Sequence, residues 1–136
     1  MILSAEEFAR LRQSDDPAEY QRAGNEEAPV EVRLAVVSRY PPLREWVAHN
    51  KTIPVSVLDV LAKDLDPRVR STVASKRSLS VELQQVLARD ADSSVRERLA
   101  CNAKCTAEVL QLLSGDSEAH VRAAAVKKLS ERRSAL

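Results

Sequence analysis

Hydrophobic side chains recur along the chain at helical spacing, in short segments separated by polar turns. Their spacing is that of one buried stripe on each of a pair of helices. In one such pair these positions are Val69, Val73 and Ala74, then Leu83, Val86 and Leu87. The second helix of the next pair has Val109, Leu112 and Leu113. Helices of roughly ten residues are marginal alone, so packing against neighbours must stabilise them. The pattern predicts an all-α protein of about ten short helices.

The pattern returns with a period of about 26 residues, which indicates an internal repeat. Several columns of the repeat keep one residue type, namely Val69, Val95 and Val121; Arg70, Arg96 and Arg122; Leu61, Leu87 and Leu113; and Asp64, Asp90 and Asp116. Stepping back by one period keeps the register, since Pro41 falls on Pro67 and Arg44 on Arg70. We therefore expect a right-handed α-solenoid in which each repeat contributes two helices.

Local signals place the helix starts. Asp66 is a good N-cap and Pro67 suits the first helical position, where no N–H is needed. Ser80 and Thr106 are expected to cap the second helix of their repeats. These signals divide a single domain, 1–136, into an N-terminal capping helix within 1–15, repeats at about 16–40, 41–65, 66–91 and 92–117, and a C-terminal capping helix in 118–136.

The repeat resembles the variant leucine-rich repeat, a family related in architecture to HEAT and armadillo repeats. The resemblance is carried by two stretches, Leu61-Ala62-Lys63-Asp64 through Val73-Ala74 and Leu87-Ala88-Arg89-Asp90 through Leu99-Ala100. It implies the fold; function depends on the surface that each member presents. The family's founding member carries a cysteine-bound iron–sulfur cluster ahead of its repeats. This chain has no cysteine before Cys101, so the resemblance implies no cofactor.

Composition and charge argue against several classes of function, namely binding to nucleic acid, to nucleotides and to membranes. The formal net charge is +1, which gives no strong electrostatic attraction to nucleic acid or anionic membranes. Two glycines leave no glycine-rich phosphate loop. No apolar run has transmembrane length, and the first residues lack a secretory signal pattern, so we expect a cytoplasmic protein.

The repeating arginines and aspartates form the first candidate cluster, which we call the arginine–aspartate ladder. Its members are Arg44, Arg70, Arg96 and Arg122 with Asp64, Asp90 and Asp116. Residues that recur in every repeat usually serve stacking, so we expect each guanidinium to lie near the preceding aspartate. Phosphate or acidic-peptide recognition is the alternative.

A second set of residues forms candidate partner-binding surfaces. The turns between the two helices of a repeat carry a basic edge, Lys51, Lys76, Arg77 and Lys104. The exposed positions of the second helices are expected to line a concave face and include Asp59, Lys63, Glu82, Gln85, Arg89, Glu108 and Gln111. Trp46, beside His49, either belongs to an interaction patch with Arg39 and Tyr40 or packs against the N-terminal helices.

Nothing in the sequence favours catalysis or metal binding. Cys105 occupies a hydrophobic column and is expected to be buried, and two cysteines without nearby ligands do not make a zinc site. We therefore expect a non-catalytic protein–protein interaction module, such as an adaptor or an immunity-type protein, that uses the concave face and the basic edge. The alternative is a nucleic-acid-binding protein that contacts phosphates through the basic edge and the C-terminal tail.

Overall fold

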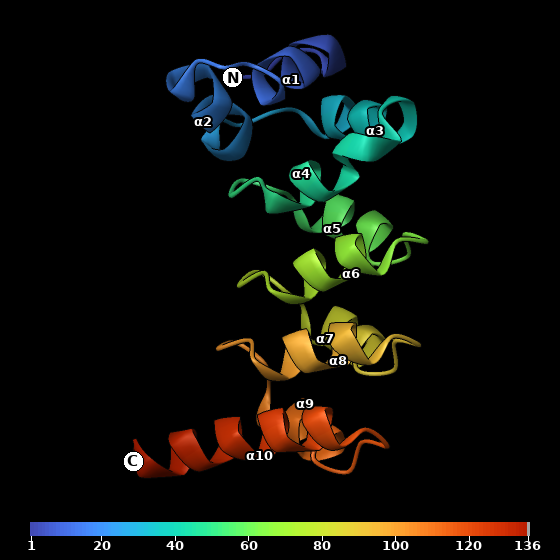
Figure 1. The fold of residues 1–136 in the computed structure, drawn as a ribbon, viewed down its shortest axis with the longest axis vertical. Coiled ribbons are helices and arrows are strands. Elements are labelled where there is room, and N and C mark those ends of the chain that lie inside the picture. Colours follow the sequence, from blue (N-terminus) through green and yellow to red (C-terminus); the bar gives the residue numbers. More distant parts are fainter. Residues whose placement is uncertain (136) are drawn as a thin grey trace. The chain divides into compact units, whose positions relative to one another are not determined.

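The computed structural model describes residues 1–135, and these residues contain ten α-helices, one short 3₁₀-helix and no strands. The predicted all-α class is confirmed. The chain divides into two compact units, which we call the N-terminal unit, Met1–Leu61, and the C-terminal unit, Ala62–Leu136 (Figure 1).

The N-terminal unit has six helical elements. They are α1 (Ala5–Arg12), α2 (Pro17–Asn25), α3 (Val30–Arg39), the 3₁₀-helix η1 (Pro41–Leu43), α4 (Arg44–His49) and α5 (Val55–Leu61). Helix α1 packs against α2 and α3, and α4 packs against α2, α3 and α5. Ser4 caps α1 by accepting a hydrogen bond from the Glu7 amide, and Asp16 caps α2. The helix that was expected within residues 1–15 is α1.

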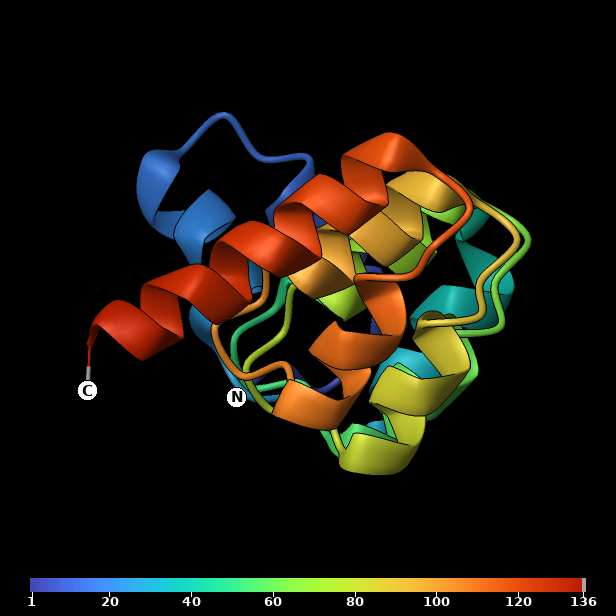
Figure 2. The ribbon, with the colours of Figure 1, turned by 90° about the horizontal axis from the view of Figure 1, so that it is seen from below.

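The C-terminal unit is more regular. Its helices are α6 (Pro67–Ala74), α7 (Val81–Leu87), α8 (Ser93–Ala100), α9 (Ala107–Leu113) and α10 (Ala119–Ser134). Helix α8 packs between α6 and α10, and α10 runs alongside it in Figure 2. The short helices α7 and α9 each contact α8.

The expected helix caps of the C-terminal unit are confirmed. Asp66 accepts a hydrogen bond from the Arg68 amide, and Pro67 is the first residue of α6. Ser80 and Thr106 cap α7 and α9 through their hydroxyl groups. These side chains satisfy amides that the first turn leaves without partners.

The core follows most of the predicted stripe. Leu61 and Leu87 are fully buried, and Leu113 has 1% of its surface exposed. Two positions depart from the prediction, because Val86 and Leu112 are 54% and 52% exposed. The prediction that they are core residues is wrong. The buried residues of the seven-residue helix α7 are Leu83, Gln84 and Leu87, so Val86 lies on its solvent-exposed side.

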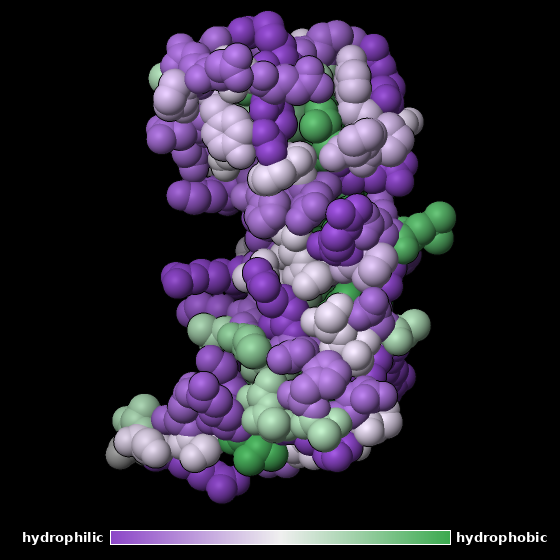
Figure 3. Space-filling model, in the orientation of Figure 1, coloured by the Kyte–Doolittle hydropathy of each residue, from purple (hydrophilic) through white to green (hydrophobic). Residues whose placement is uncertain are grey.

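Elsewhere the visible surface is polar. The face drawn in Figure 3 is mostly hydrophilic, with hydrophobic side chains in small separate groups. Scattered exposed apolar residues are normal for a folded protein. Apolar side chains gathered in a hollow are more informative, and the C-terminal unit contains such a hollow.

Candidate functional site

The arginine–aspartate ladder forms the same contacts twice in the C-terminal unit. Arg70 donates to both carboxylate oxygens of Asp90, at 2.8 and 3.1 Å, and Arg96 donates to both of Asp116, at 2.8 and 3.2 Å. The guanidiniums also donate to the backbone carbonyls of Asp64 and Asp90, at 2.7 and 2.6 Å. Each arginine therefore connects the turn before its own helix to a turn two helices later. Arg70 on α6 reaches the turn before α8, and Arg96 on α8 reaches the turn before α10.

Arg70 and Arg96 lie beside the preceding aspartate, as expected, but the carboxylate they pair with belongs to another residue. The preceding aspartate supplies its backbone carbonyl, whereas the carboxylate comes from the aspartate 20 residues downstream. The two side-chain pairs are largely buried, with Arg70 and Arg96 only 16% and 12% exposed. Bidentate contacts in such surroundings are stronger than exposed ion pairs.

The ends of the ladder are different. Arg122 donates to the backbone carbonyls of Asp116 and Ser117, and its side chain is exposed. In the N-terminal unit Arg44 donates to the carbonyl of Val37 at 2.7 Å. The carboxylate of Asp64 accepts a hydrogen bond from the Asp66 amide.

The ladder shifts the ionisation of its members. The hydrogen bond to Asp116 raises the pKa of Arg96, and the bond to Asp90 raises that of Arg70. Burial pushes the pKa of Asp116 upward, but the hydrogen bonds from Arg96 and from the Glu118 amide outweigh it, so the pKa lies below its ordinary value of 3.8. Both charged forms are favoured in the folded protein.

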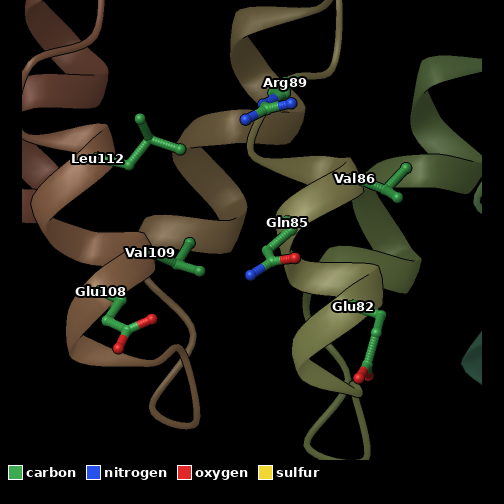
Figure 4. Close-up of a pocket in the computed structure, with 7 residues that line it drawn as sticks. All are labelled: Glu82, Gln85, Val86, Arg89, Glu108, Val109 and Leu112. Atoms are coloured by element: carbon green, nitrogen blue, oxygen red, sulfur yellow. The ribbon is translucent and has the colours of Figure 1, made fainter.

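A groove between α7 and α9 brings several of the candidate partner-binding residues together. Its cavity has a volume of about 570 Å³ and is lined by Glu82, Gln85, Val86, Arg89, Glu108, Val109 and Leu112. Figure 4 shows the two glutamates at one end, Arg89 at the other, and the apolar side chains with Gln85 between them. The groove is thus acidic at one end, apolar in the middle and basic at the other end.

Val86 and Leu112 were missed as surface residues because two neighbouring columns of the second helix are apolar. Val86 is followed by Leu87, and Leu112 is followed by Leu113, so each second helix has two apolar residues in a row. Hydrophobic periodicity alone does not decide which of two adjacent apolar columns faces the core. The structure shows that Leu87 and Leu113 face the core, whereas Val86 and Leu112 are exposed.

The remaining predicted surface residues are mostly exposed but lie outside the groove. Gln111 and Lys63 in the C-terminal unit and Asp59 in the N-terminal unit are exposed. On the basic edge, Arg77 and Lys104 are exposed and Lys76 is half-buried. Arg132 of α10 donates to the carbonyl of Ala103 at 3.0 Å, so one base of the C-terminal helix lies at the turn that carries Lys104.

Buried polar side chains were not found from the sequence. Gln84 donates to the carbonyl of Lys104 and accepts from the Thr106 amide at 2.9 Å. Asn102 donates to the carbonyls of Ala74 and Lys76, at 2.8 Å each. These amides hold the turn before α9 against the preceding helix pair. The sequence did offer one sign of these contacts, because Asn50 lies two periods of 26 residues before Asn102.

The N-terminal unit has its own buried network, centred on Arg33. Its guanidinium donates to the Asn50 side-chain oxygen at 3.1 Å, to the Thr52 hydroxyl at 2.6 Å and to the Ala28 carbonyl at 2.9 Å. Asn50 in turn donates to the carbonyl of Ala23. Burial lowers the pKa of Arg33, and three good acceptors compensate for the lost hydration.

A serine, a histidine and a glutamate also meet on α8 and α10. One ring nitrogen of His120 lies 2.8 Å from Glu97, and the other lies 3.2 Å from the Ser93 hydroxyl. The sequence did not indicate this cluster, because its members are up to 27 residues apart. His120 and Glu97 are about half exposed, so water competes for these contacts.

Trp46 and its neighbours form a separate hollow in the N-terminal unit. Trp46 is half-buried on α4, with its ring 5.4 Å from that of His49. The Arg12 guanidinium lies 3.5 Å from the Trp46 ring centroid. Arg39 instead pairs with Glu6 and lies over Tyr40. Trp46 therefore packs against the N-terminal helices while it still lines a cavity with His49 and Lys51.

Cys105 is buried, as expected, with 1% of its surface exposed. Burial raises the pKa of its thiol to about 11. Cys101 is exposed and free. In residues 1–135 no three His, Cys, Asp or Glu side chains are grouped as metal ligands would be. Among the helices of these residues, none is long and apolar enough to cross a bilayer.

Comparisons with known protein families, with curated proteins and with solved structures found no match to this chain. The groove, the ladder and the two buried networks are therefore interpreted from their own geometry.

Proposed function

We propose that this protein is a non-catalytic protein–protein interaction module, an adaptor or immunity-type protein, that binds a partner protein in the groove between α7 and α9. The observation that carries the proposal is the pair of exposed apolar side chains, Val86 and Leu112, inside a cavity of about 570 Å³. Leaving such side chains in water within a hollow is unfavourable, and covering both with a partner recovers that free energy.

The charges of the groove give the partner an orientation. Glu82 and Glu108 favour a basic group at one end, and Arg89 favours an acidic group at the other. Gln85 between them offers hydrogen-bond donors and an acceptor. A partner segment with an apolar centre and opposite charges at its ends complements this arrangement.

We also propose that the helix pairs are variant leucine-rich repeats, stacked as a right-handed solenoid with a period of about 26 residues. Support comes from the two bidentate contacts, Arg70–Asp90 and Arg96–Asp116, whose equivalent members lie one period apart in the sequence. In such stacks the second helices line the concave face, and partners usually bind there. The basic edge would then border the bound partner.

Nucleic-acid binding is the competing function. Arg132 reaches the turn that carries Lys104, so two cations that could contact phosphates lie close together. A protein that neutralises phosphates loses affinity steeply with salt, with a log–log slope of about 0.9 per contact. The ladder arginines do not contribute here, because Asp90 and Asp116 occupy two of them. We expect no submicromolar binding to nucleic acid at physiological salt.

Photo-crosslinking tests the proposal. A photoreactive residue at Gln85, inside the groove, should capture a discrete protein from an extract of the native cell, whereas one at Arg98 on α8 should not. Leu112→Glu places a charge in the groove and should abolish the crosslink. Val126→Glu is the matched control, because Val126 on α10 is 55% exposed and does not line the groove.

Two results would contradict the proposal. One is equal capture by the Gln85 and Arg98 positions. The other is crosslinking to nucleic acid that is lost when Lys76 and Arg77 are both changed to Glu.

A further inference from the structure

The hollow beside Trp46 is the second cavity that carries a specific chemistry. It has a volume of about 320 Å³ and lies wholly in the N-terminal unit, between the end of α1, α2 and α4. Arg12 is the last residue of α1, Tyr20 lies on α2 and Trp46 on α4. The Arg12 guanidinium is 3.5 Å from the Trp46 ring centroid and 4.6 Å from that of Tyr20.

Stacking fixes the guanidinium but does not satisfy its donors. An arginine whose planar face lies over aromatic rings keeps its N–H groups at the edge of the plane. The buried Nε of Arg12 has no hydrogen-bond partner, and within residues 1–135 the side chain makes no ion pair. Arg10, two residues earlier on the same helix, does pair with Glu19. A buried N–H without an acceptor is costly, so Arg12 is a group that lacks its partner.

The other residues around the cavity add positive charge and apolar surface. Lys51 brings a second cation, and His49, which also lines the cavity, is about half exposed and lies 3.8 Å from Glu45. Among the described residues that line the cavity, none carries a carboxylate. A Cβ built at Gly24, which also lines it, would meet no atom within 4 Å, so the space there is open.

We propose that this pocket binds a small organic anion, a carboxylate or a phosphate monoester carried on an apolar body. The anionic group would accept hydrogen bonds from the edge of the Arg12 guanidinium, with Lys51 nearby, and the apolar body would lie against Trp46 and Tyr20. The volume is at the lower end of the range of about 300–1,000 Å³ that small-molecule pockets span. This site is independent of the groove between α7 and α9 and takes a different class of ligand.

Trp46 is the only tryptophan of the chain, so its fluorescence reports on this pocket alone. The full-length protein is titrated with phenyl phosphate, benzoate, inorganic phosphate and the neutral benzamide, with excitation where the probes do not absorb. At least one aromatic anion should change the Trp46 emission saturably and bind at least about tenfold more tightly than benzamide, a difference of ~1.4 kcal/mol. Inorganic phosphate should bind more weakly than phenyl phosphate. The preferred anion, carboxylate or phosphate, identifies the natural headgroup.

Two variants of the same helix separate binding from folding. Arg12→Gln should weaken the aromatic anion at least about tenfold, whereas Arg10→Gln should leave its affinity unchanged. Circular dichroism checks that both variants fold. If Arg12→Gln does not fold, Lys51→Gln replaces it, since Lys51 is exposed, and should weaken binding severalfold. The proposal is overturned if no aromatic anion gives a saturable change, if benzamide binds equally well, or if the folded variant binds like the wild type.

Discussion

The two units place their arginine-mediated contacts at different depths. In the N-terminal unit a single arginine, Arg33, is buried among backbone carbonyls and the side chains of Asn50 and Thr52. In the C-terminal unit the equivalent helix position, four residues after the N-cap, holds the neutral Gln84. The paired arginines there, Arg70 and Arg96, lie nearer the surface, with 16% and 12% of the side chain exposed. A guanidinium that is fully removed from water needs several acceptors in one place, whereas one that keeps some contact with water can be held by a carboxylate and one carbonyl. The buried contact occurs once, whereas the contact nearer the surface is made twice with the same geometry, by Arg70 and by Arg96.

The largest expected effect should be the same in both units, because both use the same leucine column in the core. Leu87→Ala and Leu113→Ala in the C-terminal unit, and Leu61→Ala in the N-terminal unit, should each cost about 2–5 kcal/mol, because each empties a buried position. Chemical denaturation measures the loss. Leu112→Ala, on a half-exposed position, should cost less than about 1 kcal/mol.

The buried network of the N-terminal unit should give the next largest effect. Arg33→Met keeps most of the side-chain volume but removes three hydrogen bonds, and should cost about 2–3 kcal/mol because acceptors around it are left unpaired. Arg39→Met on the same helix is the control. Its ion pair with Glu6 joins two side chains that are more than half exposed, so the change should be within about 0.5 kcal/mol. Equal losses for the two variants would remove the contrast between the units.

The arginine–aspartate contacts of the C-terminal unit should stabilise the fold somewhat less. Arg96→Ala removes a bidentate contact to Asp116 and should lower the free energy of unfolding by about 1–3 kcal/mol. Arg122→Ala is the matched control, because Arg122 occupies the same column but contacts only backbone carbonyls. It should cost less than about 1 kcal/mol. A loss for Arg122→Ala as large as for Arg96→Ala would show that the carboxylate pairing contributes nothing.

Acid should weaken the same contact. The pKa of Asp116 is lowered in the folded protein, so its stabilising contribution is fully present above the ordinary value of 3.8 and is lost as the pH falls through the lower folded value. Thermal unfolding followed from pH 7 to pH 3 should show the gap between wild type and Asp116→Asn closing below about pH 4. A gap that stays constant over this range would exclude a charged contact as its source.

The sequence predicted what depends on neighbouring residues and missed what depends on distant ones. The caps at Asp66, Ser80 and Thr106 involve groups two or three residues away, and all three were predicted correctly. Arg96 does contact the preceding Asp90, as expected, but only through its backbone carbonyl. Its carboxylate partner, Asp116, lies 20 residues downstream and was not predicted. Gln84 was missed for the same reason, because its partners lie 20 and 22 residues away.

The groove was predicted in part. Glu82, Gln85, Arg89 and Glu108 were expected on an exposed face, and they line the cavity. Its apolar centre was not expected, because the sequence pattern placed Val86 and Leu112 in the core. The acidic and basic ends therefore follow from the sequence, whereas the feature that most favours binding a protein comes from the structure.

The most direct test of the central claim, that the groove between α7 and α9 binds a protein, is an affinity measurement on the partner recovered by crosslinking at Gln85. Calorimetric titration would compare the wild type with Leu112→Glu and with Val126→Glu, all at conditions where each is fully folded. We predict that Leu112→Glu weakens binding at least about tenfold, which is ~1.4 kcal/mol, and that Val126→Glu binds as the wild type does. Equal affinity of the wild type and Leu112→Glu for that partner would contradict the claim.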